Sequence, residues 1–476
     1  MNGNESQPSV DYYEFFQKMA ARTIEYFTRI AKEASDNRLL VGSYYGYYWG
    51  HVSAAPYHSL DSGNFGVRYL LESPWIDFIG GPYPYGERRD GCEINGFPRS
   101  LALHGKIWES EGDMRTHRSG EDQRQYGTTD NLAESIEVAK RDYALNRSAG
   151  SCYYFFDFVD NWYDDPEFMD TVAKLVRIDN FLRERKDSFP RRVAIVVSEE
   201  MVPHLSNTES PWLWRITEGE RSENPRIGIP YDVILDADLK SVDFSQYQAV
   251  IFQDAYFASD ETIRLVKEKI RKNGRKTIFY YSPGIVSPEN QYDLDRSEQL
   301  TGIRLELDET KGDTIVRLKN GTAAMDNGAV SPRIFVNDKQ ANVFAEFADG
   351  VPAAATKSMP DSCESIVISH PQPNHAFMRE VLANCGLKIY QTKGNAQCYF
   401  AGPMLAIYSR GPGSGEFELP DSTEIVADFF TGEIIAENAS SFKEAFPSTP
   451  QTRMLFVGLR KDWQAYLEML EHTEMQ

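Results

Sequence analysis

The sequence predicts an α/β protein made of three consecutive parts. Residues 1–187 alternate helical segments with apolar strands, which favours a parallel sheet flanked by helices. Residues 188–392 carry short β-rich runs separated by amphipathic segments, the pattern of a doubly wound α/β domain. Residues 393–476 are β-rich and predict a small antiparallel β-sandwich. A length of 476 residues agrees with about three domains at roughly 150 residues each.

The first part divides into four β/α units. A helix is expected over residues 11–34, where apolar side chains recur at helical spacing. The four strand segments are RLLVGSYYGYYWG (38–50), PWIDFIGGPYPY (74–85), LALHGKIWESEGDMRTH (101–117) and SCYYFFDFVDNWYDD (151–165). Helices are expected over residues 64–72, 129–146 and 166–185. Each strand segment ends in aromatic and polar residues. Because ligands of parallel β/α folds bind at the carboxyl ends of the strands, the sequence predicts a ligand site at those ends.

The second and third parts contain regular strands but no nucleotide-binding motif. The runs RVAIVVS, YDVILDA, AVIFQDA and KTIFYYSPG are buried-type strands, and residues 259–274 between two of them have helical periodicity. No GxGxxG or GxxxxGK motif follows any of them. The runs CYFAGPMLAIYS, STEIVADFFTGEIIA and TRMLFVGL form the expected β-sandwich.

Composition and charge exclude several classes of protein. Hydrophobic residues make up 41% and aromatic residues 13%, as expected for a globular chain. A net charge of −21 argues against broad binding to nucleic acid. No apolar run reaches about 18 residues, and the N-terminal residues lack the basic and apolar regions of a signal peptide. The five cysteines form no CxxC pair, so we expect no zinc cluster, no disulfide framework and a reducing, cytoplasmic location. No organic cofactor is expected.

The order of these parts resembles the β-galactosidases of glycoside hydrolase family 42. The resemblance rests on VGSYYGYYWG, SPWIDFIGGPYPYGERR, LHGKIWESEGDMRTH and FFDFVDNWYDDPEFM in the first part. GIPYDVILDADLKSVDFSQYQAVIF resembles the family's glutamine-amidotransferase-like trimerisation domain, and ADFFTGEIIAENASSF resembles its C-terminal β domain. The resemblance implies a partial (β/α)8 barrel over residues 1–187, the trimerisation domain over 188–392 and the β-sandwich over 393–476. It also implies a carbohydrate substrate and a homotrimer.

Only half of such a barrel fits into the first part. An eightfold barrel needs eight β/α units and typically about 250 residues. The four motifs match the fifth to eighth strands of the resembled family, whose general acid/base is a glutamate after an asparagine on the fourth strand. The Asn4-Glu5 pair of this sequence lies in a polar N-terminal stretch instead. We therefore expect open edges covered by another chain or by the second domain, and weak activity of this chain alone. A fragment, a partner chain that supplies the first half of the barrel, and a decayed enzyme all remain open.

The resemblance assigns the catalytic nucleophile to Glu111. Retaining glycosidases use two carboxyl groups about 5–5.5 Å apart, one as nucleophile and one as an acid with a raised pKa. Glu109 shares a strand face with Glu111, at about 6.5–7 Å between Cβ atoms, so a self-contained pair is conceivable. The alternative is a solvated charge cluster in which Arg115 pairs with Glu111 or with Asp113.

Further candidates for substrate binding cluster near the same strand ends. They are Tyr45, Tyr47, Lys106, Trp108, Glu109, Arg115, Asp157 and Trp162. An aromatic ring can stack on the C–H face of a sugar, although each of these rings could instead pack in the core. Asp157 and Asp160 could bind sugar hydroxyls. No metal site is expected, because no three or four ligands converge in the sequence.

The predicted function is hydrolysis of terminal β-glycosides with retention, through a glycosyl-enzyme on Glu111. The alternative is a non-catalytic carbohydrate-binding or assembly protein that works mainly through its trimerisation-like domain.

Overall fold

The computed structural model describes most of the chain in ten segments. These are residues 7–47, 62–82, 88–91, 93–158, 161–204, 220–309, 312–313, 315–321, 323–325 and 329–474. None of the helices within these segments has a stretch long and apolar enough to span a bilayer.

The first part contains a four-stranded, fully parallel sheet in the order β1-β2-β3-β4. Its strands are β1 (Gly42–Tyr44), β2 (Phe78–Pro82), β3 (Ile107–Gly112) and β4 (Cys152–Phe155). Its helices are α1 (Gln7–Ala34), α3 (Pro98–Leu103), α4 (Leu132–Ala149) and α5 (Pro166–Leu182), with short 3-10 turns η2 (Val67–Tyr69) and η4 (Glu121–Tyr126). The predicted alternation of parallel strands and helices is confirmed. The predicted start of the third strand at Leu101 is wrong, because Leu101–Leu103 end helix α3 and β3 begins at Ile107.

Two helix boundaries follow directly from capping residues. The side chain of Asn131 accepts the backbone N–H of Glu134, and Gly150 takes a left-handed conformation, so α4 begins and ends between them. Asp165 caps α5, with Pro166 at its first position.

One expected helix is shorter than predicted, and part of another faces solvent. The helix expected over residues 64–72 is only the 3-10 turn η2, in a segment where Gly63 and Gly66 disfavour a regular helix. Helix α1 exists, but several of its apolar residues point to solvent and not to the core. Tyr12, Phe15 and Phe27 are 56%, 62% and 63% exposed.

The second part is built on a nine-stranded mixed sheet. Five strands are parallel, in the order β6-β5-β7-β8-β17. They are β5 (Val193–Val197), β6 (Tyr231–Leu235), β7 (Ala249–Phe252), β8 (Lys276–Tyr280) and β17 (Glu364–Ile368). The antiparallel strands β16 (Pro352–Ser358), β15 (Asn342–Phe347), β11 (Val316–Leu318) and β12 (Ala324–Met325) extend it. The parallel half carries the doubly wound pattern that the sequence predicts.

Helices and two-stranded pairs complete this part. The helices are α7 (Glu220–Glu223), α8 (Asp260–Leu265), α9 (Leu294–Thr301) and α10 (His375–Asn384), and the short turn η5 covers Val202–His204. The pairs are β9 (Leu305–Asp308) with β14 (Arg333–Val336), and β10 (Gly312–Asp313) with β13 (Ala329–Val330).

The third part consists of two antiparallel sheets around a common apolar core. One sheet contains β19 (Gln397–Ala401), β20 (Met404–Ser409), β25 (Gln451–Gly458), β22 (Ile425–Asp428) and β23 (Ile434–Glu437). The other contains β18 (Gln391–Lys393), β21 (Gly413–Glu418) and β24 (Ser441–Phe446). The antiparallel β region is confirmed, and the chain adds a helix, α11 (Arg460–Glu474), that the sequence prediction did not include.

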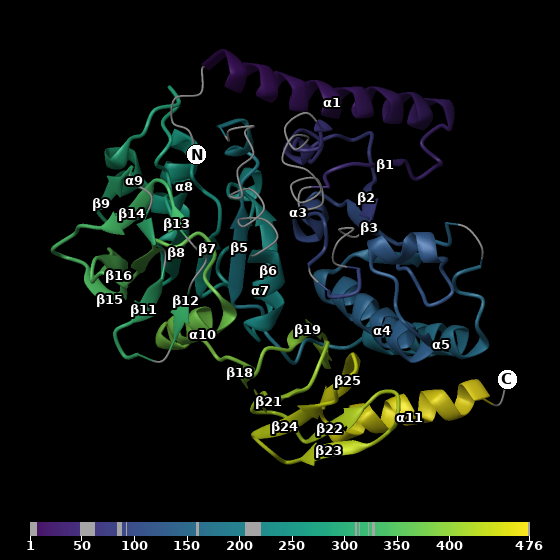
Figure 1. Ribbon diagram of the computed structural model, residues 1–476. Helices are drawn as coiled ribbons and strands as arrows, with labels where there is room; N and C mark the ends of the chain where they lie inside the picture. The colour runs from purple at the N-terminus through teal and green to yellow at the C-terminus, as the bar shows by residue number, and fades with distance from the viewer. Residues whose placement is uncertain are drawn as a thin grey trace.

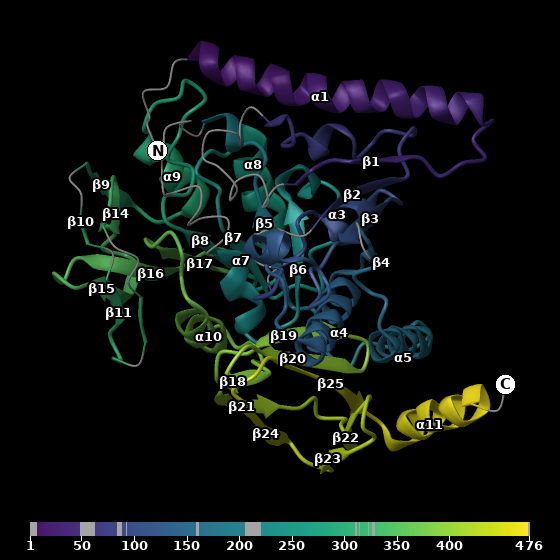
Figure 2. The same cartoon turned by 45° about the vertical axis from the view of Figure 1, so that its right-hand side comes forward.

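The three parts contact one another closely. Helix α1 lies along the top of the molecule and reaches from β1 to η5 of the second part (Figure 1). Helix α4 packs on β19 and β25 of the third part (Figure 2). The strand ends of the first part are therefore held by helices that also contact the other two.

Candidate active site

Strand β3 presents its two glutamates on one face. Trp108 and Ser110 are buried on the other face, whereas Glu109 and Glu111 are half-buried. Glu111 lies opposite Pro82 of β2 and Tyr154 of β4. The shared face of the two glutamates follows from the two-residue repeat of a strand, as the sequence predicts.

Two tyrosine hydroxyls form a chain that ends on Glu111. The hydroxyl of Tyr154 donates to Oε2 of Glu111 at 3.4 Å, and the hydroxyls of Tyr154 and Tyr44 are hydrogen-bonded to each other. Because Tyr154 has one proton, and it goes to Glu111, Tyr44 must be the donor in the second bond. The carboxylate of Glu111 is thereby oriented at the carboxyl end of β3.

The same contact shows that the four-stranded sheet is curved. Tyr44 is on β1 and Tyr154 is on β4, with two strands between them. In a flat sheet these strands would lie about 14 Å apart, with side chains roughly perpendicular to the sheet. With side chains perpendicular to the strands, the hydroxyls meet when the sheet curls toward them, so the contact favours a sheet with Glu111 on its concave face.

Both tyrosines are held in the neutral form that donates hydrogen bonds. Burial raises the pKa of Tyr44, and the nearby Glu111 carboxylate raises it further. Burial also raises the pKa of Tyr154, and the charges of Glu111 and Glu109 add to the effect. The site is thus a carboxylate supported by two phenolic donors.

Three of the predicted sugar-binding rings are buried in the structure. Trp108, Trp162 and Tyr45 are 1%, 2% and 3% exposed. The Trp108 ring lies so close to Gly96 that a Cβ atom there would be 2.1 Å from it, and its Nε1 donates to Ser110 Oγ at 3.0 Å. Rings this enclosed pack in the core, the alternative that the sequence left open, and offer no face to a ligand in this conformation.

Two of the predicted charged residues make structural contacts. Lys106 donates through Nζ to the backbone carbonyl oxygens of Ser73 and Ile76, and burial lowers its pKa. Arg115 forms an ion pair with Asp113 at 3.3 Å, and its guanidinium lies 4.4 Å from the centre of the Trp162 ring. Of the two pairings considered for Arg115, the structure contains the one with Asp113.

The remaining candidates lie nearer to Glu111. The half-buried ring of Tyr47 contacts Tyr44 edge-on, with centroids 6.5 Å apart. Asp157 is exposed just beyond the end of β4, and Asp160 lies outside the described residues. The structure therefore places Glu109 on the face of Glu111 and Tyr47 beside Tyr44, and leaves Asp157 exposed after β4.

Tyr44 and Tyr154 are the residues that sequence reasoning missed. Each belongs to a Tyr-Tyr pair at a strand end, and in the first pair the prediction selected the neighbour, Tyr45. The alternation of faces along a strand was a usable signal, because only one residue of each pair can share the face of Glu111.

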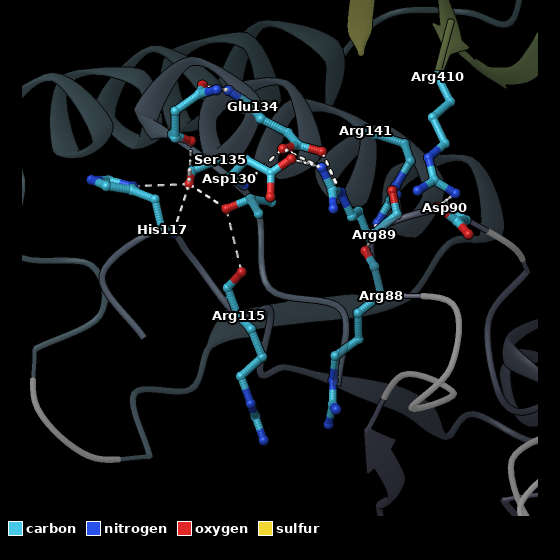
Figure 3. A network of polar contacts seen from close by, with 12 residues as sticks. Arg88, Arg89, Asp90, Arg115, His117, Asp130, Glu134, Ser135, Arg141 and Arg410 are labelled. Atoms are coloured by element: carbon cyan, nitrogen blue, oxygen red, sulfur yellow. Dashed lines mark hydrogen bonds and ion pairs between the residues drawn. The ribbon is translucent and has the colours of Figure 1, made fainter. Parts of the chain in front are cut away.

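A polar network fixes the loops behind this site (Figure 3). Nε of Arg88 donates to Asp113 at 2.9 Å, and Arg141 donates to the backbone carbonyl oxygens of Arg88 and Arg89. Arg89 in turn pairs with Glu134 on α4. Burial raises the pKa of Asp113, while the Arg88 charge opposes that effect. The loops after β2 and β3 are thus tied to α4 and to each other.

The third part reaches this network as well. The hydroxyl of Tyr408 donates to the backbone carbonyl of Arg89 at 2.9 Å, and Arg410 pairs with Asp90. Among the residues that the structure describes, no three His, Cys, Asp or Glu side chains converge as metal ligands.

Several solved structures have a fold similar to that of this chain. The β-galactosidase from the psychrophilic Marinomonas ef1 matches with a TM-score of 0.60 and 12% identity, over 96% of this chain and 70% of that one. The β-galactosidase from Bacillus circulans sp. alkalophilus matches with a TM-score of 0.54 and 13% identity, over 84% and 66%. A catalytic mutant of a GH42 β-galactosidase from G. stearothermophilus matches with a TM-score of 0.52 and 17% identity, over 84% and 66%.

This chain has a β-galactosidase-like fold. It spans 66% of the length of two of these β-galactosidases, just under two thirds. A scan of protein-family models and a search of curated proteins find no match. At identities of 12–17% the likeness concerns the fold, so activity has to be argued from the site itself.

Proposed function

We propose that this chain belongs to a retaining glycoside hydrolase that acts on terminal β-glycosides, with Glu111 as the nucleophile. The observation that carries the proposal is the half-buried carboxylate at the carboxyl end of β3, on the concave face of a parallel sheet and supported by Tyr154. Ligands of parallel β/α folds bind at this edge. The β-galactosidase-like fold supports a β-galactoside as the substrate class.

In the proposed first step, a Glu111 oxygen attacks the anomeric carbon of the sugar and forms an ester as the leaving oxygen departs with a proton. The Tyr154 hydroxyl holds the other oxygen of the carboxylate. In the second step, a water attacks the same carbon and releases Glu111. Both steps need a second carboxyl group about 5–5.5 Å away, first as acid and then as base.

We propose that this second carboxyl comes from a polypeptide segment that completes a half-barrel of four β/α units. β1 and β4 form the outer edges of the described parallel sheet. Helix α1 exposes Tyr12, Phe15 and Phe27 beside that sheet, and an apolar face of this kind marks an interaction surface. The covering segment is a partner chain or a further part of the same polypeptide.

We further propose a homotrimer assembled through residues 188–392, the part of the sequence that resembles the trimerisation domain of family 42 β-galactosidases. Light scattering of the purified chain tests this assembly. A particle of 54.2 kDa at micromolar concentration would contradict it.

The catalytic proposal is tested by hydrolysis of nitrophenyl β-galactoside and of a natural disaccharide. An aryl leaving group needs little protonation, so the chain alone should hydrolyse the aryl substrate far better than the disaccharide. General acid help typically contributes about 10²–10⁴-fold. Robust disaccharide hydrolysis by this chain would refute the proposal that another polypeptide segment supplies the acid.

Matched variants separate the two glutamates of β3. Glu111→Gln should abolish aryl hydrolysis, whereas Glu109→Gln on the same face should retain most of it. Glu111→Ala with added azide should yield α-galactosyl azide, because azide replaces the missing nucleophile. Unchanged activity of Glu111→Gln would refute the assignment of Glu111 as the nucleophile. If Glu109→Gln lost as much activity as Glu111→Gln, the two glutamates would form a self-contained catalytic pair, and no external carboxyl would be needed.

A further inference from the structure

An arginine-lined cleft of about 640 Å³ opens where the three parts of the chain meet. It lies between the C-terminal ends of α4 and α5, the residues just before β5, the start of β6 and the turn between β19 and β20. Six arginines line it: Arg99, Arg147, Arg183, Arg185, Arg191 and Arg192. The carboxylates of the lining are Asp187 and Asp232. Such a surplus of cations is unexpected in a chain with a net charge of −21.

Two of these guanidinium groups, those of Arg99 and Arg147, lack a close acceptor. By contrast, Arg183 pairs with Asp179 at 2.9 Å, Arg185 with Asp462 at 3.3 Å, and Arg192 donates to the Gln246 carbonyl oxygen at 3.1 Å. The contacts of Arg99 and Arg147 are distant ion pairs, from Nε of Arg99 to Asp232 at 4.0 Å and from Nε of Arg147 to Asp179 at 3.6 Å. The Nε atoms of Arg147 and Arg185 are also shielded from solvent without a hydrogen-bond acceptor. Buried N–H groups are nearly always satisfied in native proteins, so the hydrogen bonding of this arginine cluster is incomplete in the structure.

Helix dipoles explain only half of the cluster. Arg147, Arg183 and Arg185 lie at or just beyond helix C-termini, where cations are favourable. Arg99, however, lies in the first turn of α3, where the dipole disfavours a cation.

The remaining two, Arg191 and Arg192, do not lie at a helix end but directly before strand β5. Arg191 is fixed by the backbone carbonyl oxygens of Tyr231 at 2.7 Å, Ser148 at 2.6 Å and Phe400 at 3.0 Å. These three carbonyls come from all three parts of the chain, so the charge of Arg191 is held in place at their junction.

We propose that this cleft binds a small, multiply charged oxyanion of the diphosphate class. Guanidinium groups donate paired hydrogen bonds to phosphate oxygens, and the volume lies within the range of small-molecule sites. The bound anion accepts hydrogen bonds from guanidinium groups that face the cleft, such as those of Arg99 and Arg147, and offsets the mutual repulsion of the arginines. Because all three parts line the cleft, the anion also stabilises their arrangement.

The cleft is separate from the candidate active site. It adjoins the starts of β5 and β6 and the C-terminal ends of the helices, whereas Glu111 lies at the carboxyl end of β3. The inference is therefore independent of the proposed glycosidase activity, and its test needs no substrate.

The test is calorimetric titration of the chain with pyrophosphate at about 0.15 M salt, together with thermal unfolding with and without the anion. Wild-type protein should bind pyrophosphate and unfold at a higher temperature in its presence. The double variant Arg99→Gln/Arg147→Gln should lose about tenfold or more in affinity, because two charged donors are removed. Without the anion, this variant should unfold near the wild-type temperature, since neither guanidinium makes a close contact.

The matched control is Arg22→Gln/Arg38→Gln, which removes the same charge from two exposed positions. This control should bind pyrophosphate like the wild type. Equal loss of affinity in the control, or equal binding of pyrophosphate and sulfate at matched ionic strength, would reduce the effect to general charge screening and overturn the proposal. Absence of binding at about 10 mM pyrophosphate would overturn it too. Binding of an acidic peptide such as hexaglutamate without binding of pyrophosphate would replace the small anion by a protein partner.

Discussion

Glu199 should make the stability of this protein fall as the pH rises. It follows β5, is 1% exposed, and its carboxylate accepts the backbone N–H groups of Val67 at 3.0 Å and Arg68 at 2.9 Å. Burial raises its pKa from 4.5 to about 7, and the nearby charge of Asp236 also raises it. The two N–H groups and the charge of Arg68 lower the pKa but do not cancel this effect. The contact joins the first part of the chain to the second.

The magnitude follows from the two pKa values. Between pH 4.5 and about 7 the folded chain keeps a proton that the unfolded chain has lost, so the free energy of unfolding decreases over this range and is constant above it. At about 1.4 kcal/mol for each pH unit, the full decrease is about 3 kcal/mol. Glu199→Gln keeps the shape and an acceptor oxygen but does not titrate, so it should lack this decrease.

Urea unfolding of wild type and Glu199→Gln at pH 5 and pH 8 provides the assay. Between these two pH values, the free energy of unfolding of the wild type should fall by about 2 to 3 kcal/mol relative to that of Glu199→Gln, because most of the titration range lies between them. Asp243→Asn is the control without a pH effect in this range: hydrogen bonds from Ser245 lower the pKa of Asp243 from 3.8, so this carboxyl is ionised in the folded and the unfolded chain at both pH values. A difference between wild type and Glu199→Gln that stays constant with pH would refute the reasoning.

Three further substitutions test the network behind the site. Asp113→Ala should lower the free energy of unfolding by about 3–5 kcal/mol, because it leaves the buried guanidinium of Arg88 without its partner; a loss below about 1 kcal/mol in urea unfolding would contradict this. Asn131→Ala should cost about 1 kcal/mol by removing the cap of α4, whereas Asn131→Asp should be nearly neutral in the same assay. Tyr408→Phe should cost about 1 kcal/mol, because it deletes the hydrogen bond to the Arg89 carbonyl; an unchanged unfolding midpoint would show that this bond adds no net stability.

Much of the fold could be read from local patterns. Each predicted strand segment of the first part contains a strand, although the third begins at Ile107 and not at Leu101. The Asp165-Pro166 start of α5 is where the sequence signals it. Helix α1 shows the limit of such patterns. Helical spacing predicts that Phe15 and Phe27 lie on one apolar stripe, but not whether that stripe meets the core or, as here, solvent.

The candidate site divides in the same way. The sequence by itself determined that Glu109 and Glu111 share a face, because the two-residue repeat is a property of any extended backbone. It could not determine that Tyr44 and Tyr154 meet above Glu111, because that contact depends on the curvature of four strands. Curvature arises from the packing of helices and loops on the sheet, which joins residues more than one hundred positions apart.

The arginines show the same division between local and tertiary causes. Charge alone left two partners open for Arg115, and only the folded loop places it beside Asp113. Likewise, Arg99, Arg147 and Arg191 carry no common motif and come from separate segments, yet the docking of the three parts gathers them around one cleft. Short-range geometry fixes which way a side chain points along its own element. Long-range packing of the elements decides which side chains it meets.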